Sequence, residues 1–111
     1  MKTPMIYLMN SPVLTRYGLW QFSPLSVEAA RHLLQTTAFT SAIGHDSTAE
    51  LLSHLLDMPI AANRIQVELG SGDQAVVFRI KTRLPEGQIL TAGEMANIPY
   101  ELARLDWLGE A

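Results

Sequence analysis

The pattern of apolar and polar positions predicts a strand and then a helix in the first third of the chain. Residues 5–9 are an unbroken apolar run that ends at Asn10 and a Ser-Pro pair, which is typical of a strand covered on both faces and closed by a turn. Apolar residues then recur at a spacing near 3.6 between Ser26 and Leu34, and the serine is suited to cap the first turn. We therefore expect a central strand over 5–9 and a helix from Ser26.

A second helix is predicted in the middle of the chain. Ser47 and Glu50 form a Ser-x-x-Glu capping box, in which the two side chains accept backbone N–H groups at the helix start. Leucines follow at positions 51, 52, 55 and 56, and Pro59 limits the helix at its other end. The pattern predicts a helix with Ser47 as its N-cap that stops before Pro59.

The second half of the chain predicts mainly β-structure. Ile65, Val67 and Leu69 alternate with polar residues, a turn sequence occupies 70–73, and a β-rich run covers 75–81, which together predict a hairpin. The other elements expected here are a turn at 83–87, a short helix behind the Thr-x-x-Glu box of 91–94, and a last strand over 100–108.

These elements predict one domain, residues 1–111, of α/β (mixed α+β) class, with a small mixed β-sheet flanked by helices. Apolar residues make up 48% of the chain and charged residues only 17%, so the chain can bury a core and is unlike a disordered segment. No internal repeat or Gly/Ser tract divides it into two folding units.

Composition excludes several classes of function. The chain has no cysteine, which removes disulfide scaffolds, zinc-thiolate sites and thiol nucleophiles. Its net charge of -3 gives no electrostatic case for coating duplex DNA, whose binders usually present a basic face. The apolar run at 5–9 is too short for a signal peptide or a membrane span, so we expect a cytoplasmic protein without membrane contact.

The segment 43–50 is the main candidate for chemistry, because it places His45 two residues before the predicted N-cap. The first turn of a helix has N–H groups without intrahelical partners and the positive end of the dipole, which together favour an anion such as phosphate. Gly44 would let a ligand approach the backbone, and histidine is suited to proton transfer near neutral pH. Local sequence alone favours a simpler interpretation, in which this is a plain loop and Asp46 and Ser47 only cap the helix.

The other two histidines do not suggest a metal site. His32 lies four residues after Glu28, which is the spacing of an ordinary surface pair on a helix. His54 lies inside the leucine-rich helix and is expected at its polar edge. His45 and His54 are nine residues apart without an accompanying carboxylate pattern, so we expect no metal and no other cofactor.

Basic residues form a second cluster after the second helix. Arg64 lies on the predicted hairpin, and Arg79, Lys81 and Arg83 share one face of a strand by the period of two, as a stripe able to contact phosphates. On local grounds a solvated strand face is the more favoured interpretation. Glu86 belongs to a surface turn, although near a histidine its carboxylate would orient the imidazole.

With these residues in place, the chain resembles a known family, the small ring nucleases of archaeal and bacterial viruses that act as anti-CRISPR proteins against type III systems and have cellular relatives. The resemblance spans about 85 residues and rests on three ordered blocks, of which the middle one is the most specific. The blocks are Tyr7-Leu8-x-Asn10, then Ile43-Gly44-His45-Asp46-Ser47-Thr48, and last Asn63-Arg64-Ile65 followed by Arg83-Leu84-x-Glu86-Gly87-x-Ile89-Leu90-Thr91.

The resemblance implies a homodimer whose two-fold pocket binds cyclic tetra-adenylate, a second messenger of type III CRISPR systems, and cuts it to linear adenylates without a metal. In this comparison His45 matches the catalytic histidine and Glu86 the assisting glutamate. The matching ligand-binding positions are Asn10, Gly44, Asp46, Ser47, Thr48, Arg64 and Arg83. After Asn10 the chain departs from the pattern of the viral members, with Ser11-Pro12-Val13 following.

The residue chemistry is compatible with this reaction, because RNA carries its own nucleophile, the 2′-hydroxyl beside each phosphate. Two alternatives follow from the same residues. One is a module that binds or sequesters a cyclic nucleotide without cleaving it. The other is a DNA-binding regulator that uses Arg79, Lys81 and Arg83, which the acidic balance of the chain disfavours.

Overall fold

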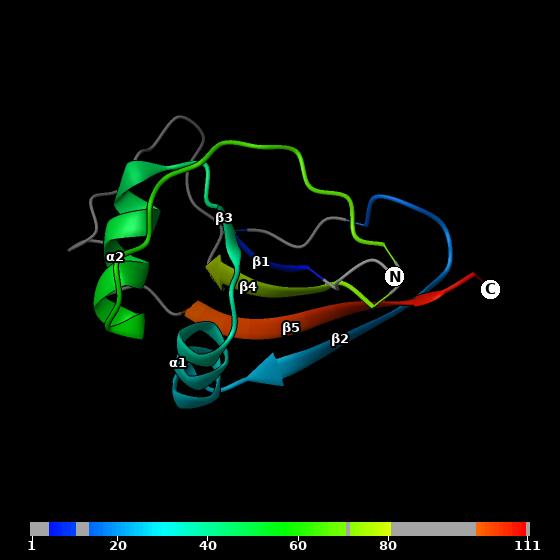
Figure 1. Ribbon diagram of the computed structural model, residues 1–111, viewed down its shortest axis with the longest axis horizontal. Coiled ribbons are helices and arrows are strands. Elements are labelled where there is room, and N and C mark those ends of the chain that lie inside the picture. Colours follow the sequence, from blue (N-terminus) through cyan, green and yellow to red (C-terminus); the bar gives the residue numbers. More distant parts are fainter. Residues whose placement is uncertain (1–4, 11–13, 71, 81–99, 111) are drawn as a thin grey trace.

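The computed structural model describes residues 5–10, 14–70, 72–80 and 100–110, and these residues form one β-sheet and two helices (Figure 1). In chain order the elements are β1 (Ile6–Met9), β2 (Leu19–Leu25), α1 (Val27–Thr36), β3 (Thr40–Ala42), α2 (Asp46–Leu56), β4 (Gln74–Ile80) and β5 (Tyr100–Gly109).

The sheet has five strands in the order β2-β5-β4-β1-β3 and is mixed. β1 pairs in parallel with both β3 and β4, whereas β5 is antiparallel to β4 and to β2. Because β1, β3 and β4 run in the same direction, their C-terminal ends meet at one edge of the sheet, which we call the carboxyl edge. Figure 1 shows both helices toward this end of the sheet and the loop before β2 at the opposite end.

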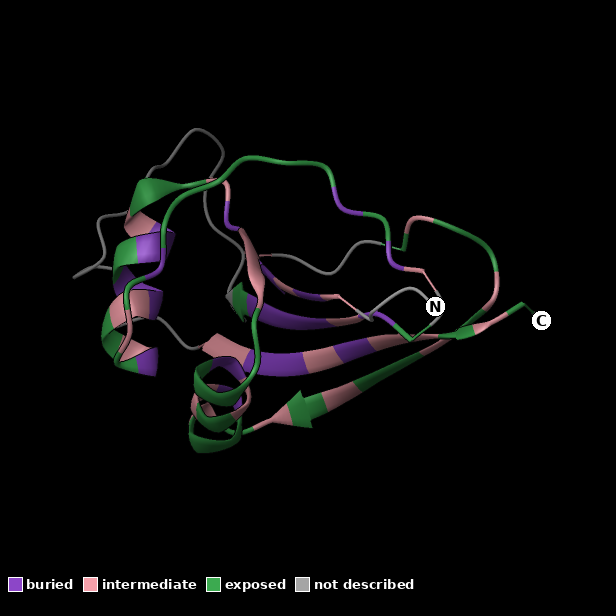
Figure 2. Ribbon diagram, in the orientation of Figure 1, coloured by how far each residue is buried: buried purple, intermediate pink, exposed green. Residues whose placement is uncertain are grey.

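Both helices pack on one face of the sheet and form the larger hydrophobic core. Figure 2 shows the buried side of α2 turned toward the sheet, while β2 stays largely exposed. The central strands contribute Leu8, Val76 and Phe78, and each is at most 2% exposed. The two helices contribute Ala30, Leu34, Ala49, Leu51, Leu52 and Leu56. Burial of this apolar stripe of each helix is the main stabilisation expected for the fold.

The other face of the sheet is covered in part by the chain segment that follows α2. Val67 and Leu69 of this segment are buried, and they pack with Ala75, Val77 and Leu105 of the sheet. Partly buried Tyr7, Trp20 and Trp107 border this second cluster. The sheet therefore has apolar residues on both faces, which explains why β1 is apolar without alternation.

A buried carboxylate connects the beginnings of the two central strands. Asp73, only 3% exposed, accepts the N–H of Met5 at its Oδ1 and the N–H of Gly70 at its Oδ2, both at 2.8 Å. The N–H of Asp73 in turn donates to the carbonyl of Gly70 at 3.0 Å, which closes the predicted turn. Asp73 thus satisfies two backbone donors that would otherwise be buried without a partner.

The predicted mixed α+β class is confirmed. Among the predicted elements, α2 is the helix expected before Pro59, and β4 is the β-rich run expected over 75–81. β1 corresponds to the apolar run 5–9, and α1 begins after Ser26, whose hydroxyl accepts the N–H of Ala29 at 3.0 Å. β5 corresponds to the last predicted strand. The turn expected at 83–87 and the helix expected at 91–94 lie outside the described residues.

The predicted hairpin is wrong. The structure has no strand over 63–70, and β4 pairs with β1 and β5 instead. Ile65 is 43% exposed while Val67 and Leu69 are buried, so the alternation in the sequence reflects an extended segment packed on a sheet face. The sequence pattern also indicated neither β2, which contains Pro24, nor the three-residue strand β3.

Candidate functional site

Residues from two parallel strands meet at the carboxyl edge. Met9 of β1 is in register with Ala42 of β3, so Asn10 and Ile43 follow at the same edge of the sheet. Gly44 and His45 then lead into α2. In sheets with parallel strands, ligands commonly bind at the carboxyl ends of the strands, where loops of separate strands come together. The fold thus brings the first and second blocks of the sequence motif to one place.

His45 begins α2 and leaves its imidazole exposed. The residue is the N-cap, with φ -133° and ψ 135°, and its carbonyl accepts the N–H of Ala49 at 3.0 Å. The side chain makes no capping hydrogen bond. Because the first intrahelical bond comes from Ala49, the backbone N–H groups of Asp46 and Ser47 have no acceptor within the helix. An exposed imidazole and two such donors therefore lie at the positive end of the helix dipole.

The position of this N-cap corrects the prediction that assigned it to Ser47. Local sequence favours Ser47 because serine is a good cap and Glu50 completes a box, but the helix begins earlier, at Asp46. Ser47 therefore lies within the first turn, and Asp46 before it is exposed. Thr48 is buried, with 3% of its surface exposed, and it has an interaction partner. The correction moves His45 from the approaching loop to the helix start itself.

Arg64 is brought to the same place by the segment that runs beside β3. Ile43 and Ala62 form a parallel bridge, and Asn63 donates from its backbone N–H to the carbonyl of Ile43 and from Nδ2 to the carbonyl of Ser41, each at 2.7 Å. The next residue is Arg64, so the segment delivers its guanidinium to the loop that carries His45.

The Arg64 guanidinium lies over Gly44. Its Nη2 donates to the Gly44 carbonyl at 3.4 Å, and a Cβ built on Gly44 would lie 3.6 Å from Nε of Arg64. This is ordinary contact distance, so the glycine leaves backbone surface open between the guanidinium and the helix start. The arginine is exposed and belongs to an extended segment, which corrects the expectation that a hairpin carries it.

Asn63 is a residue that the sequence analysis did not place in the site. Its two hydrogen bonds to the β3 segment determine where Arg64 lies, so its role is to position that arginine. The sequence motif already contains Asn63, which directly precedes Arg64 in the third block and could have indicated its place in the site.

Two of the predicted site residues, Arg83 and Glu86, lie outside the described residues, as does Lys81 of the proposed basic stripe. The described member of that stripe, Arg79, forms an ion pair with Glu101 of the neighbouring strand. Both side chains are partly exposed, and the pairing agrees with a solvated strand face at this position.

The remaining histidines are exposed on the helices, His32 on α1 and His54 in the last turn of α2. Among the described residues, no group of three or more histidine, aspartate or glutamate side chains is arranged to hold a metal ion. Within the same residues, neither helix is long and apolar enough to cross a membrane.

Comparison with known proteins identifies the family. Residues 6–102 match the family described as STIV B116-like. Protein 26 of Sulfolobus islandicus filamentous virus is 36% identical over 96% of this chain and 91% of its own length, and YddF of Bacillus subtilis is 30% identical over 91% and 98%. The solved structure of B116 of Sulfolobus turreted icosahedral virus superposes with a TM-score of 0.70 at 24% identity, covering 92% of this chain and 98% of B116, which shows a common fold. The chain is a member of the STIV B116-like family.

Proposed function

We propose that this protein is a metal-independent ring nuclease that cleaves cyclic tetra-adenylate and so ends a type III CRISPR signal. The observation that carries the proposal is the position of His45, an exposed imidazole at the N-cap of α2 that takes no part in capping. The Arg64 guanidinium lies beside the same loop, over Gly44. An acid, a cation and helix N–H donors in one exposed place are suited to protonate the leaving oxygen of a phosphodiester and to stabilise its negative charge.

The reaction needs no metal, because the substrate carries its own nucleophile. The 2′-oxygen of one ribose attacks the adjacent phosphorus and forms the O2′–P bond, its proton passing to water. The bond from phosphorus to the 5′-oxygen breaks, and His45, as imidazolium, donates a proton to that departing oxygen. The products are linear adenylates with a 2′,3′-cyclic phosphate at one end and a 5′-hydroxyl at the other. A positioned acid contributes about 10²–10⁴-fold to the rate.

The negative charge of the phosphoryl oxygens is balanced by groups at the carboxyl edge. The N–H groups of Asp46 and Ser47 and the guanidinium of Arg64 supply donors there. The family resemblance adds Arg83 as a second arginine and Glu86 as the residue that assists the histidine, and both assignments rest on the sequence motif.

Two copies of the chain complete the proposed site. A four-fold symmetric ring placed on a two-fold axis presents equivalent phosphates to both copies of His45. This symmetry explains how a chain of 111 residues surrounds a ligand of four nucleotides. The carboxyl edge is the part of the fold that would face the axis.

The experiment is incubation of the protein with cyclic tetra-adenylate in EDTA, with the products separated by chromatography. We expect linear adenylates with the wild-type chain, none with His45→Ala, and wild-type rates with His54→Ala, an exposed histidine at the other end of the same helix. Binding of the ring, measured by calorimetry, should persist in His45→Ala because other donors hold the phosphates.

Two results would reject this assignment. Absence of product with stoichiometric wild-type protein that still binds the ring would identify a sequestering module instead of a nuclease. Loss of cleavage in His54→Ala to the same extent as in His45→Ala would show that the effect is structural.

A further inference from the structure

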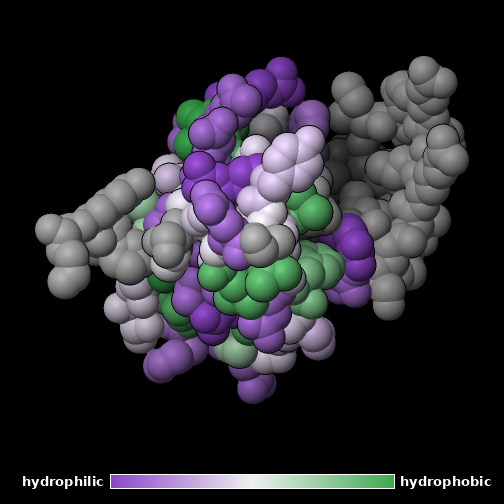
Figure 3. Space-filling view, turned by 90° about the vertical axis from the view of Figure 1, so that its right-hand side faces the viewer, coloured by the Kyte–Doolittle hydropathy of each residue, from purple (hydrophilic) through white to green (hydrophobic). Residues whose placement is uncertain are grey.

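The end of the molecule opposite the carboxyl edge carries a cluster of exposed large apolar side chains, which we call the distal patch. Its exposed members are Leu14 and Tyr17, with exposures of 64% and 99%. Trp20 and Trp107 lie beside them and are partly buried. Figure 3, which looks onto this end, shows hydrophobic and near-neutral residues at its centre with hydrophilic residues among them. Clusters of this kind on a small protein mark interaction surfaces.

Two tryptophan side chains hold the loop that presents Tyr17, while the tyrosine ring itself is exposed. The indole N–H of Trp20 donates to the Arg16 carbonyl at 3.1 Å, and that of Trp107 donates to the Tyr17 carbonyl at 3.3 Å. Gly18 has φ +137°, and a Cβ there would lie 2.3 Å from Nε1 of Trp107, so only glycine fits. The loop therefore fixes the backbone of a tyrosine whose ring is almost entirely in solvent. Such pre-organisation reduces the entropy lost on binding.

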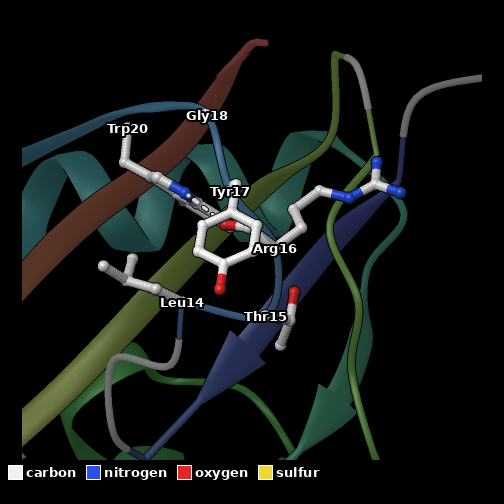
Figure 4. Close-up of a pocket in the computed structure, with 6 residues that line it drawn as sticks. All are labelled: Leu14, Thr15, Arg16, Tyr17, Gly18 and Trp20. Carbon is white, nitrogen blue, oxygen red and sulfur yellow. Dashed lines mark hydrogen bonds between the residues drawn. The ribbon is translucent and has the colours of Figure 1, made fainter. Parts of the chain in front are cut away.

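Hollows of about 540 and 490 Å³ adjoin this tyrosine. Leu14, Thr15 and Trp20 help to line the first, as Figure 4 shows, and Trp107 and Glu110 help to line the second. Arg16, Tyr17 and Gly18 line both. The patch thus presents a projecting ring directly beside apolar recesses, and both shapes lie on one surface.

The residue types at the patch are those that dominate protein interfaces. Tryptophan, tyrosine and arginine are enriched among the residues that contribute most binding energy, and the patch has all of them. The Arg16 guanidinium lies 4.4 Å from the centre of the Trp107 ring, which holds it at the surface. These features favour a protein partner over a small molecule.

The charges identify which partner fits. Arg16 and Glu110 line the same hollow, and neither has an ion-pair partner among the residues that the structure describes. A surface with one acid, one base, one projecting ring and adjoining recesses is complementary to itself, as an isologous two-fold contact requires. We propose that the distal patch binds a second copy of this chain, with Tyr17 of each copy entering a hollow of the other and Arg16 of each facing Glu110 of the other.

This contact is separate from the dimer that the proposed function requires. The distal patch and the carboxyl edge lie at opposite ends of the sheet, so one contact does not obstruct the other (Figure 1). Burial of Tyr17 alone removes about 200 Å² from water, roughly a quarter of the 800 Å² per partner in a standard interface. Leu14, the two tryptophans and the Arg16–Glu110 pairs supply further area.

The test is the self-association of the full chain, measured by sedimentation equilibrium. In Tyr17→Ser we expect the dissociation constant of one association step to rise by about 30-fold or more, as for truncation of a central aromatic hot spot. The mass at micromolar concentration should fall to that of the monomer or, where a second contact persists at the carboxyl edge, to that of the dimer formed there. Because Tyr17 is 99% exposed in the single chain, its replacement should leave the melting temperature unchanged at concentrations too low for association.

Charge reversal provides the matched control. Arg16→Glu and Glu110→Arg should each weaken the association, and the double variant Arg16→Glu with Glu110→Arg should restore it. Glu28→Arg on α1 makes the same change in net charge as Glu110→Arg and should leave association as in the wild type. An unchanged mass in Tyr17→Ser, or no rescue in the double variant, overturns the proposal. Either result is independent of cleavage of the adenylate ring.

Discussion

Replacement of His45 by serine is expected to stabilise the protein while abolishing its proposed activity. Histidine is not a good N-cap residue, and the imidazole makes no capping bond, although the backbone at position 45 has the extended geometry that N-caps adopt. The N-cap of α1 shows what a serine does in this position, because the Ser26 hydroxyl accepts the N–H of Ala29 at 3.0 Å. A serine at position 45 would accept an N–H of the first turn of α2 in the same way.

The expected gain in the free energy of unfolding follows from the difference between a capped and an uncapped helix. Loss of a good cap usually costs about 0.5–2 kcal/mol, so the His45→Ser exchange should add about 0.5–1 kcal/mol to the free energy of unfolding. For a chain of this length, that gain raises Tm by roughly 2–6 °C. The imidazole is exposed, so its removal leaves no cavity in the core to offset the gain.

Urea denaturation followed by circular dichroism, together with calorimetric melting, measures this change. His32→Ser is the control, because His32 is exposed within α1 and serine and histidine have similar helix propensities. That variant should stay within about 0.5 kcal/mol of the wild type. A loss of stability of more than about 1 kcal/mol in His45→Ser would refute the reasoning, since it would show that the imidazole supports the fold.

Two further variants test the contacts that organise the sheet and the distal loop. Asp73→Ala should lower the free energy of unfolding by about 2–4 kcal/mol, because the N–H groups of Met5 and Gly70 lose their acceptor. Urea denaturation measures this loss. A loss below about 1 kcal/mol would contradict the role assigned to Asp73. Gly18→Ala should cost about 2 kcal/mol or more, because the new methyl group meets the Trp107 indole at a strained φ. The fluorescence of that tryptophan should shift as the loop moves, and an unchanged spectrum and Tm would show that the loop accommodates a side chain.

Local sequence signals were sufficient to predict a strand or a helix cap where the pattern within that segment indicates its structure. The apolar run at 5–9 becomes β1 because both faces of that strand are covered. Ser26 caps α1 as predicted because its hydroxyl needs only an amide three residues away. The Ser26 cap depends on short-range geometry, and an unbroken apolar run indicates a strand covered on both faces whichever segments cover it.

Features that depend on distant pairing could not be derived in this way. The segment with Val67 and Leu69 alternates like a strand. However, β4 is already paired with β5 on one side and β1 on the other, so the segment cannot pair with it and packs on the sheet face instead. The start of α2 was misassigned because a local capping box at Ser47 competes with the earlier start that the structure adopts. The contact of Arg64 with Gly44 depends on the bridge between residues 43 and 62, which no local pattern indicates.

The central claim is tested most directly by the identity of the products formed from cyclic tetra-adenylate in EDTA. Mass spectrometry and chromatography against synthetic standards should show linear adenylates with 2′,3′-cyclic phosphate and 5′-hydroxyl ends, formed by the wild type and not by His45→Ser. A ring that remains intact with stoichiometric wild-type protein, or products with a 5′-phosphate, would contradict the account.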